Sequence, residues 1–188
     1  MTETIFALAK YGRRLGTRAE GERVREDLIS ALERLPEGQL LVVDLSGLEV
    51  LAGSFSDQVL VETADELAQG ALPGRYLLLR SPTEILVEDL DVRLKERKLA
   101  LLALVKKGGW RLLGYLPHYL VEAFAWIAEH GETTSEELAE ALSISVENAS
   151  TRFSALVRLR LARVVRESRN VGGFRHRVVS ILSLKNTP

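Results

Sequence analysis

The sequence predicts an α/β domain followed by a smaller domain of helices and a hairpin. Between residues 5 and 116, short apolar runs such as QLLVVDL (39–45) and RYLLLR (75–80) alternate with segments of helical periodicity. This alternation is typical of an α/β architecture. After Pro117, three helical segments precede two strand-like segments. We therefore expect two domains, residues 1–116 and 117–188.

Composition limits the classes of protein to which the chain can belong. Its 188 residues are 46% hydrophobic and 27% charged, which is typical of a globular protein. It has no cysteine, so disulfides and thiolate metal sites are excluded. No apolar run approaches the ~20 residues of a membrane span, and basic residues follow the first apolar run, unlike a secretion signal. We expect a cytoplasmic protein without a membrane partner.

The first domain reads as strands and helices separated by glycine or proline. Helical spacing is clearest at Val24, Leu28 and Leu32, while Gly108-Gly109 lies between two apolar runs and predicts a hairpin turn. The expected helices are 18–35, 54–68 and 83–97, and the expected strands are 5–9, 39–45, 75–80, 99–105 and 110–116.

Ser54 stands at the expected start of the second helix. Ser54 and Asp57 have the spacing of a capping box, in which a hydroxyl accepts a hydrogen bond from a free backbone N–H. Such a cap contributes about 1 kcal/mol to stability. The spacing therefore predicts that Ser54 is a helix cap.

The run LLVVDLSGLEVLAGSFSDQVLVETADEL (40–67) resembles the STAS-like domains, the family of anti-sigma factor antagonists, and the resemblance covers about residues 5–104. It implies a mixed sheet with helices, and a regulatory protein, a kinase or a sigma-factor regulator, as partner. It also matches Ser54 to the serine that a kinase phosphorylates in the family, although residues 52, 53 and 55 differ from the family's motif. Ser54 is therefore either a helix cap or a phospho-switch, in which a phosphate would add about two negative charges.

In the second domain, two short helices predict a surface suited to a DNA groove. Ser145 is the expected cap of the second of them, and Ala149, Phe153 and Leu156 recur at helical spacing. That spacing leaves small polar residues and arginine outward, as a major groove requires. The outward positions are Asn148, Thr151, Ala155 and Arg158, with Arg152 at the flank.

A basic hairpin is expected to follow this helix. Its strands are predicted at 162–167 and 175–182, with the tip at 170–173. Residues 143–188 hold nine arginines or lysines and two glutamates, a net charge of +7 in a chain whose total is −1. So local an excess of positive charge is typical of a surface that binds phosphates.

Residues 119–182, including ELAEALSIS (137–145) and LVRLRLARVVRE (156–167), resemble the winged helix-turn-helix domains of bacterial transcription regulators. Arg160 stands where such domains often have glycine. The resemblance implies a regulator that binds double-stranded DNA, and we expect a homodimer because one such domain buries little DNA surface. Asn148, Thr151, Arg152 and Arg158 are expected to contact the major groove, and Arg169, Arg175 and Arg177 to contact phosphates or the minor groove.

The sequence leaves two alternatives to a DNA-binding regulator. The first is a partner-switching interaction module, similar to an anti-sigma antagonist, whose winged helix mediates docking or dimerisation. The second is an enzyme, which the sequence disfavours: His118, His130 and His176 lack metal-ligand spacing, and no glycine-rich phosphate loop is present. We expect no catalytic residue, metal or cofactor.

Overall fold

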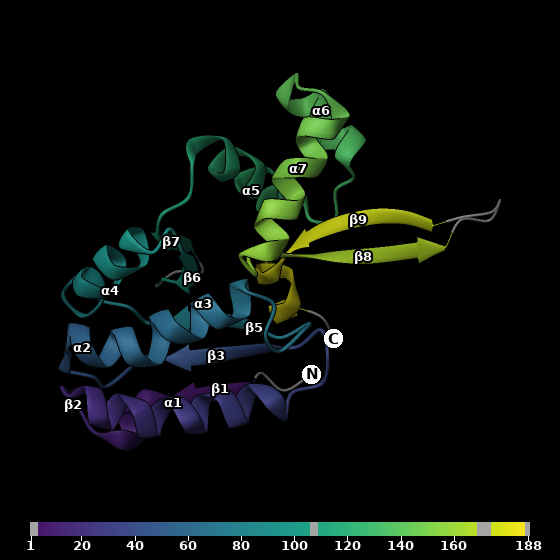
Figure 1. The fold of residues 1–188 in the computed structure, drawn as a ribbon. Coiled ribbons are helices and arrows are strands. Elements are labelled where there is room, and N and C mark those ends of the chain that lie inside the picture. The colour runs from purple at the N-terminus through teal and green to yellow at the C-terminus, as the bar shows by residue number, and fades with distance from the viewer. Residues whose placement is uncertain (1–3, 106–108, 169–173, 187–188) are drawn as a thin grey trace. The chain divides into compact units, whose positions relative to one another are not determined.

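The computed structural model describes residues 4–105, 109–168 and 174–186 (Figure 1). The chain divides between Leu116 and Pro117 into two compact units, here called the amino-terminal and carboxyl-terminal units. The prediction of an α/β protein with a mixed sheet is confirmed. Within the described ranges, no helix has the length and apolar character needed to span a membrane.

The amino-terminal unit is built on a five-stranded sheet of order β1-β3-β5-β6-β7. The first four strands in this order are parallel to one another, and β7 is antiparallel to β6. In both β3 and β5, four consecutive residues are buried, which explains why their sequences are continuously apolar rather than alternating. The strands are β1 (Thr4–Ala7), β3 (Leu40–Asp44), β5 (Tyr76–Arg80), β6 (Ala100–Leu104) and β7 (Trp110–Gly114).

Three helical stretches of this unit pack side by side (Figure 1). Helix α1 (Arg18–Glu33) begins with a capping box in which Thr17 and Glu20 satisfy each other's backbone N–H. The middle stretch, residues 53–68, lies between α1 and α4 and comprises α2 (Gly53–Ser56), a π-helical turn η2 (Asp57–Val61) and α3 (Glu62–Ala68). Helix α4 (Glu84–Glu96) is the third.

Two short strands were not predicted from the sequence. After β1, the chain forms a short 3-10 helix η1 (Leu8–Tyr11) and then β2 (Arg14–Leu15), which pairs in parallel with β4 (Val50–Leu51). The expected strand 5–9 therefore ends at Ala7. The β2–β4 pair brings the loop before α1 beside the loop before α2, which positions Gly16 next to Ser54.

The carboxyl-terminal unit comprises α5 (His118–His130), α6 (Ser135–Leu142), α7 (Val146–Arg158), the antiparallel hairpin β8 (Ala162–Ser168) and β9 (Phe174–Ser180), and the 3-10 helix η4 (Ile181–Asn186). Its core consists of buried side chains from all three helices and the hairpin. Thr133, just before α6, forms a bridge with β9, in which the Thr133 N–H donates to Val178 O (3.0 Å) and the Val178 N–H donates to Thr133 O (2.8 Å). The core includes Leu120, Phe124, Ile127, Leu138, Phe153, Leu156 and Val178.

Helix α7 ends in a left-handed residue that is not glycine. Arg160 has φ of +58°, and the Leu161 N–H donates across it to Leu156 O at 3.0 Å. The Arg160 N–H donates to Val157 O at the same distance, which completes a Schellman motif. Arg160 thus adopts the conformation that glycine adopts more readily, at some cost in backbone strain.

Candidate functional sites

Helix α7 presents a polar face to solvent. Thr151, Ser154 and Arg158 are exposed and lie at i, i+3 and i+7 on the same side of the helix. The Thr151 hydroxyl donates to Glu147 O (2.9 Å), so its oxygen retains free lone pairs. Arg158 forms no ion pair with any residue that the structure describes. Ser154 belongs to this face although the sequence analysis did not select it.

Arg152 does not belong to this exposed face. The expectation that its side chain contacts a major groove is wrong, because the side chain is buried. Its side chain is only 11% exposed and packs between α7 and α5. Nε donates to Asn148 Oδ1 (3.0 Å), Nη1 donates to Tyr119 O (3.0 Å), and Nη1 lies 3.5 Å from Glu122 Oε2. The guanidinium therefore fastens the two helices together. Asn148 remains exposed, but its side-chain carbonyl is occupied by Arg152.

The three expected arginines of the hairpin fall in different places. Arg169 lies outside the described residues. The backbone of Arg175 pairs with that of Glu167 in the hairpin. The side chain of Arg175 lies outside the described part of the structure. Arg177 is half-buried and lies opposite Val165. Its neighbour His176 is exposed, so the hairpin offers an imidazole that the sequence analysis did not assign to the site.

A cavity of about 370 Å³ lies between α7 and the hairpin. Apolar side chains from both elements line it, together with serines of α6 and α7. Arg158 and His176 also line it, so the cavity shares Arg158 with the exposed face of α7. The apolar residues are Phe153, Val157, Val164 and Val178, and the serines are Ser135, Ser150 and Ser154.

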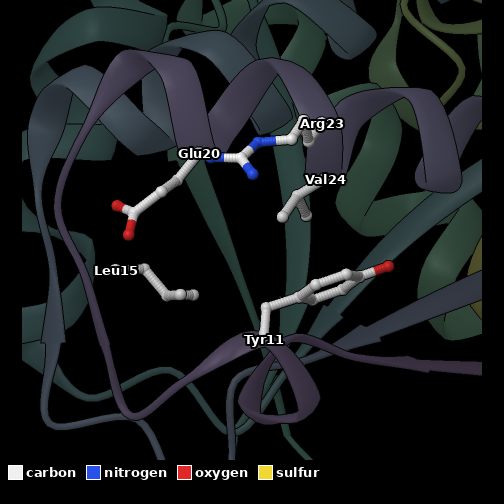
Figure 2. A pocket seen from close by; sticks show the side chains of 5 residues that line it. All are labelled: Tyr11, Leu15, Glu20, Arg23 and Val24. Atoms are coloured by element: carbon white, nitrogen blue, oxygen red, sulfur yellow. The ribbon is translucent and has the colours of Figure 1, made fainter.

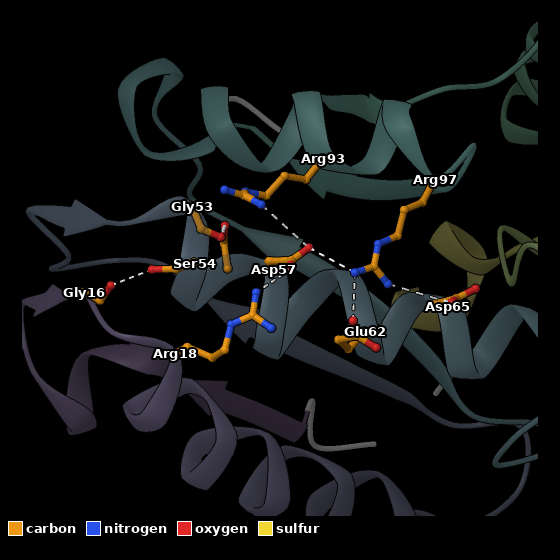
Figure 3. Close-up of polar contacts among 10 residues, drawn as sticks. Gly16, Arg18, Gly53, Ser54, Asp57, Glu62, Asp65, Arg93 and Arg97 are labelled. Atoms are coloured by element: carbon orange, nitrogen blue, oxygen red, sulfur yellow. Dashed lines mark hydrogen bonds and ion pairs between the residues drawn. The ribbon is translucent and has the colours of Figure 1, made fainter.

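Ser54 does not cap a helix, so the predicted capping box is wrong. Ala52 occupies the N-cap position of α2, and Ser54 is the second residue of the helix. The Ser54 hydroxyl donates to Gly16 O at 2.8 Å, whereas a cap would accept from a backbone N–H (Figure 3). Ser54 therefore fastens the start of α2 to the loop before α1.

Asp57, the other member of the expected box, is the centre of an arginine cluster (Figure 3). Its carboxylate is 9% exposed and lies 3.4 Å from Arg97 Nη2, 3.5 Å from Arg18 Nη2 and 4.0 Å from Arg93 Nη1. Arg97 also donates to Glu62 at 2.8 Å, and this hydrogen bond raises the pKa of Arg97 above its usual value. The cluster joins α1 and α4 to the π-helical turn.

A second cavity, also of about 370 Å³, lies between α1 and the segment before it (Figure 2). The Tyr11 hydroxyl donates to Asp27 at 2.6 Å, and burial together with Asp27 raises the pKa of Tyr11. Glu20 accepts hydrogen bonds from Thr17, which lowers the pKa of Glu20. These polar groups support α1. The remaining lining residues are Leu15, Arg23 and Val24.

Among the described residues, no group of three histidines or acids is arranged to hold a metal ion. A comparison of the chain with models of known protein families found no match, and a comparison with curated proteins found none either.

Proposed function

We propose that the protein is a cytoplasmic transcription regulator. The carboxyl-terminal unit is a winged helix-turn-helix that binds double-stranded DNA through α7. The amino-terminal unit is a STAS-like domain that responds to a signal or to a regulatory protein, and the active form is a homodimer. The observation that carries this proposal is the exposed Thr151, Ser154 and Arg158 face of α7 beside the hairpin.

The order of elements in the carboxyl-terminal unit supports the proposal. A helix is followed by a one-residue strand at Thr133, two further helices and a hairpin whose last strand pairs with Thr133. Winged helix-turn-helix domains have this order, and they place their third helix, which corresponds to α7, in the major groove.

The chemistry of the α7 face fits base edges and phosphates. An exposed arginine can donate two hydrogen bonds to guanine, and hydroxyl groups can contact either bases or phosphates. Glu147 is the exception on this side of α7, because it carries a negative charge; its own backbone N–H and the Ser145 hydroxyl lower its pKa. Glu147 opposes phosphate binding, and Arg158 favours it.

The proposed role of the amino-terminal unit depends on the loop that begins α2. Ser54 is half-buried, and its hydroxyl donates a hydrogen bond to the carbonyl of Gly16 in the loop before α1. Phosphorylation would remove this donor and place two negative charges beside the arginine cluster around Asp57. A partner kinase acting on Ser54 would thereby alter the loop that joins β2 to α1.

DNA binding can be tested by fluorescence anisotropy with a labelled random-sequence duplex at several salt concentrations. We expect salt-dependent binding, about tenfold weaker in Arg158→Ala, with the slope against log salt reduced by about one. The matched control is Arg34→Ala, which removes an exposed arginine from the amino-terminal unit and should leave affinity unchanged. The proposal fails if the wild-type protein does not bind at low salt, or if both variants bind like the wild type.

Exposed apolar side chains favour a second candidate function, a partner-switching module whose winged helix mediates docking or dimerisation. Val146 is 43% exposed at the start of α7, and Val164 is 44% exposed on β8. Sedimentation of Val164→Ser separates the candidates. Loss of self-association together with absence of DNA binding in the wild type would favour the docking module.

A further inference from the structure

The cavity between α7 and the hairpin has the size and composition of a small-molecule site. Its volume of about 370 Å³ lies within the usual range for ligand pockets. Phe153 and Val178, each 4% exposed, are the most buried of its apolar lining residues. Such a cavity accommodates a hydrocarbon group of several carbons.

The walls indicate that the occupant is partly apolar. Val164 is 44% exposed although it lines the cavity with Val157. Covering an exposed valine removes apolar surface from water, which favours binding of a hydrocarbon. A bare phosphate or a nucleotide phosphate would gain nothing from these side chains.

The charged lining residues indicate that the occupant is an anion. Arg158 and His176 line the cavity, and none of the described lining residues is acidic. A guanidinium binds a carboxylate through two parallel hydrogen bonds. The Ser154 hydroxyl donates to Ser150 O at 3.0 Å, so it can only accept from a ligand, whereas Arg158 can only donate. The strongest available polar contact is therefore with a carboxylate at Arg158.

We propose that this cavity binds a small amphipathic carboxylate, with a tail of about six to eight carbons against Phe153, Val157, Val164 and Val178, and its carboxylate on Arg158. The same guanidinium belongs to the proposed DNA-binding face, so the ligand and DNA exclude each other. Binding of the carboxylate does not depend on the proposed function. Only the competition between the carboxylate and DNA rests on the proposed function.

The site can be tested with octanoate added to the isotopically labelled full chain, observed by backbone amide NMR. We expect saturable shifts concentrated in α7 and the hairpin, and about tenfold weaker binding of hexanoate because two fewer methylenes are buried. Octylammonium and 1-octanol contain the same number of carbons, with a tail one methylene longer and without the negative charge, and should bind at least tenfold more weakly. Equal binding of all three probes, or shifts scattered over both units, would overturn the proposal.

Two variants identify the two halves of the site. Arg158→Gln should weaken octanoate binding at least tenfold, and Ser154→Phe should weaken it by placing a ring in the opening. Arg34→Gln is the matched charge control and should bind like the wild type. Amide spectra of each variant without ligand establish that the unit is folded. Wild-type affinity in a folded Arg158→Gln protein would contradict the assignment.

Competition distinguishes this inference from the proposed function. Octanoate at saturating concentration should release the labelled duplex from the wild-type protein, with little effect of octylammonium. If octanoate binds at α7 while DNA does not bind at all, the ligand site stands and the regulator proposal fails. If DNA binds and octanoate does not shift α7 or the hairpin, the inference fails and the regulator proposal stands.

Discussion

The two units use arginine in different ways. In the amino-terminal unit, Arg18, Arg93 and Arg97 converge on the buried carboxylate of Asp57. In the carboxyl-terminal unit, Arg158 is exposed and has no ion pair with a described residue, while Arg152 is buried and contacts partners on α5 and α7. A charge count therefore does not reveal which arginines can bind a ligand. Exposure does not reveal it either, because Arg18 pairs with Asp57 although 60% of its side chain is exposed. The contacts of each arginine decide it.

The largest expected effect distinguishes the two arginines of α7. Arg152→Ala removes the donor to Tyr119 O and the partner of Glu122, so we expect a loss of about 3 kcal/mol in the free energy of unfolding. Arg158→Ala, on the same helix, should change stability by less than about 0.5 kcal/mol. Urea denaturation followed by circular dichroism measures both. Equal losses would mean that Arg158 is as structural as Arg152.

The next effect concerns the arginine cluster of the other unit. Asp57→Asn leaves three guanidinium groups without their shared carboxylate. They keep partial contact with water, so the expected destabilisation is about 2 kcal/mol, below the value for a fully buried pair. DNA affinity should not change. Glu26→Gln, an exposed change on α1, is the control for stability. Weaker DNA binding in a folded Asp57→Asn protein would break the proposed separation of roles.

A smaller effect concerns a feature that the two units share. In each unit, a helix is followed by a left-handed residue that is not glycine. Lys98 after α4 and Ser143 after α6 have φ of +55° and +53°. Replacing either with glycine should stabilise its unit by about 0.5–1 kcal/mol, since glycine adopts this conformation without strain. Glu140→Gly, inside α6, should instead destabilise by about 1 kcal/mol. Thermal unfolding of the three variants checks the signs, and destabilisation by Lys98→Gly or Ser143→Gly would contradict the assignment.

The smallest expected effect concerns Glu147, the acid beside the proposed DNA-binding face. Glu147→Gln removes one negative charge near the phosphates and should tighten duplex binding by about two- to threefold at low salt. The gain should disappear at high salt because of screening. Glu140→Gln, an exposed change on α6, serves as the control. Weaker binding in Glu147→Gln would mean that the carboxylate contacts a base directly.

The central strands could be predicted from the sequence because their burial is continuous. The runs 39–45 and 75–80 are apolar along their length, and the structure places β3 and β5 there with both faces covered. Helix α1 was likewise predicted from the spacing of Val24, Leu28 and Leu32, all of which are buried. A local sequence pattern therefore suffices to predict an element whose burial is continuous or follows the helical period.

Contacts between distant residues could not be predicted. Ser54 resembled a cap, but its partner Gly16 lies 38 residues earlier and reaches it through a two-residue strand pair that has no periodicity. Arg152 lies at the edge of the apolar stripe of α7, where spacing does not say whether a long side chain turns inward. Its partner Tyr119 lies 33 residues earlier. The exposed face of α7 consequently includes Ser154, which the spacing did not single out, and does not include Arg152.

The bridge between Thr133 and Val178 couples two amide protons that are far apart in the sequence. Each donates to the other residue's carbonyl, so neither can become accessible to solvent unless the base of the hairpin separates from the residue that precedes α6. Their deuterium uptake should therefore report a common free energy of opening. Force applied to the hairpin would be transmitted to the first turn of α6 through these two bonds.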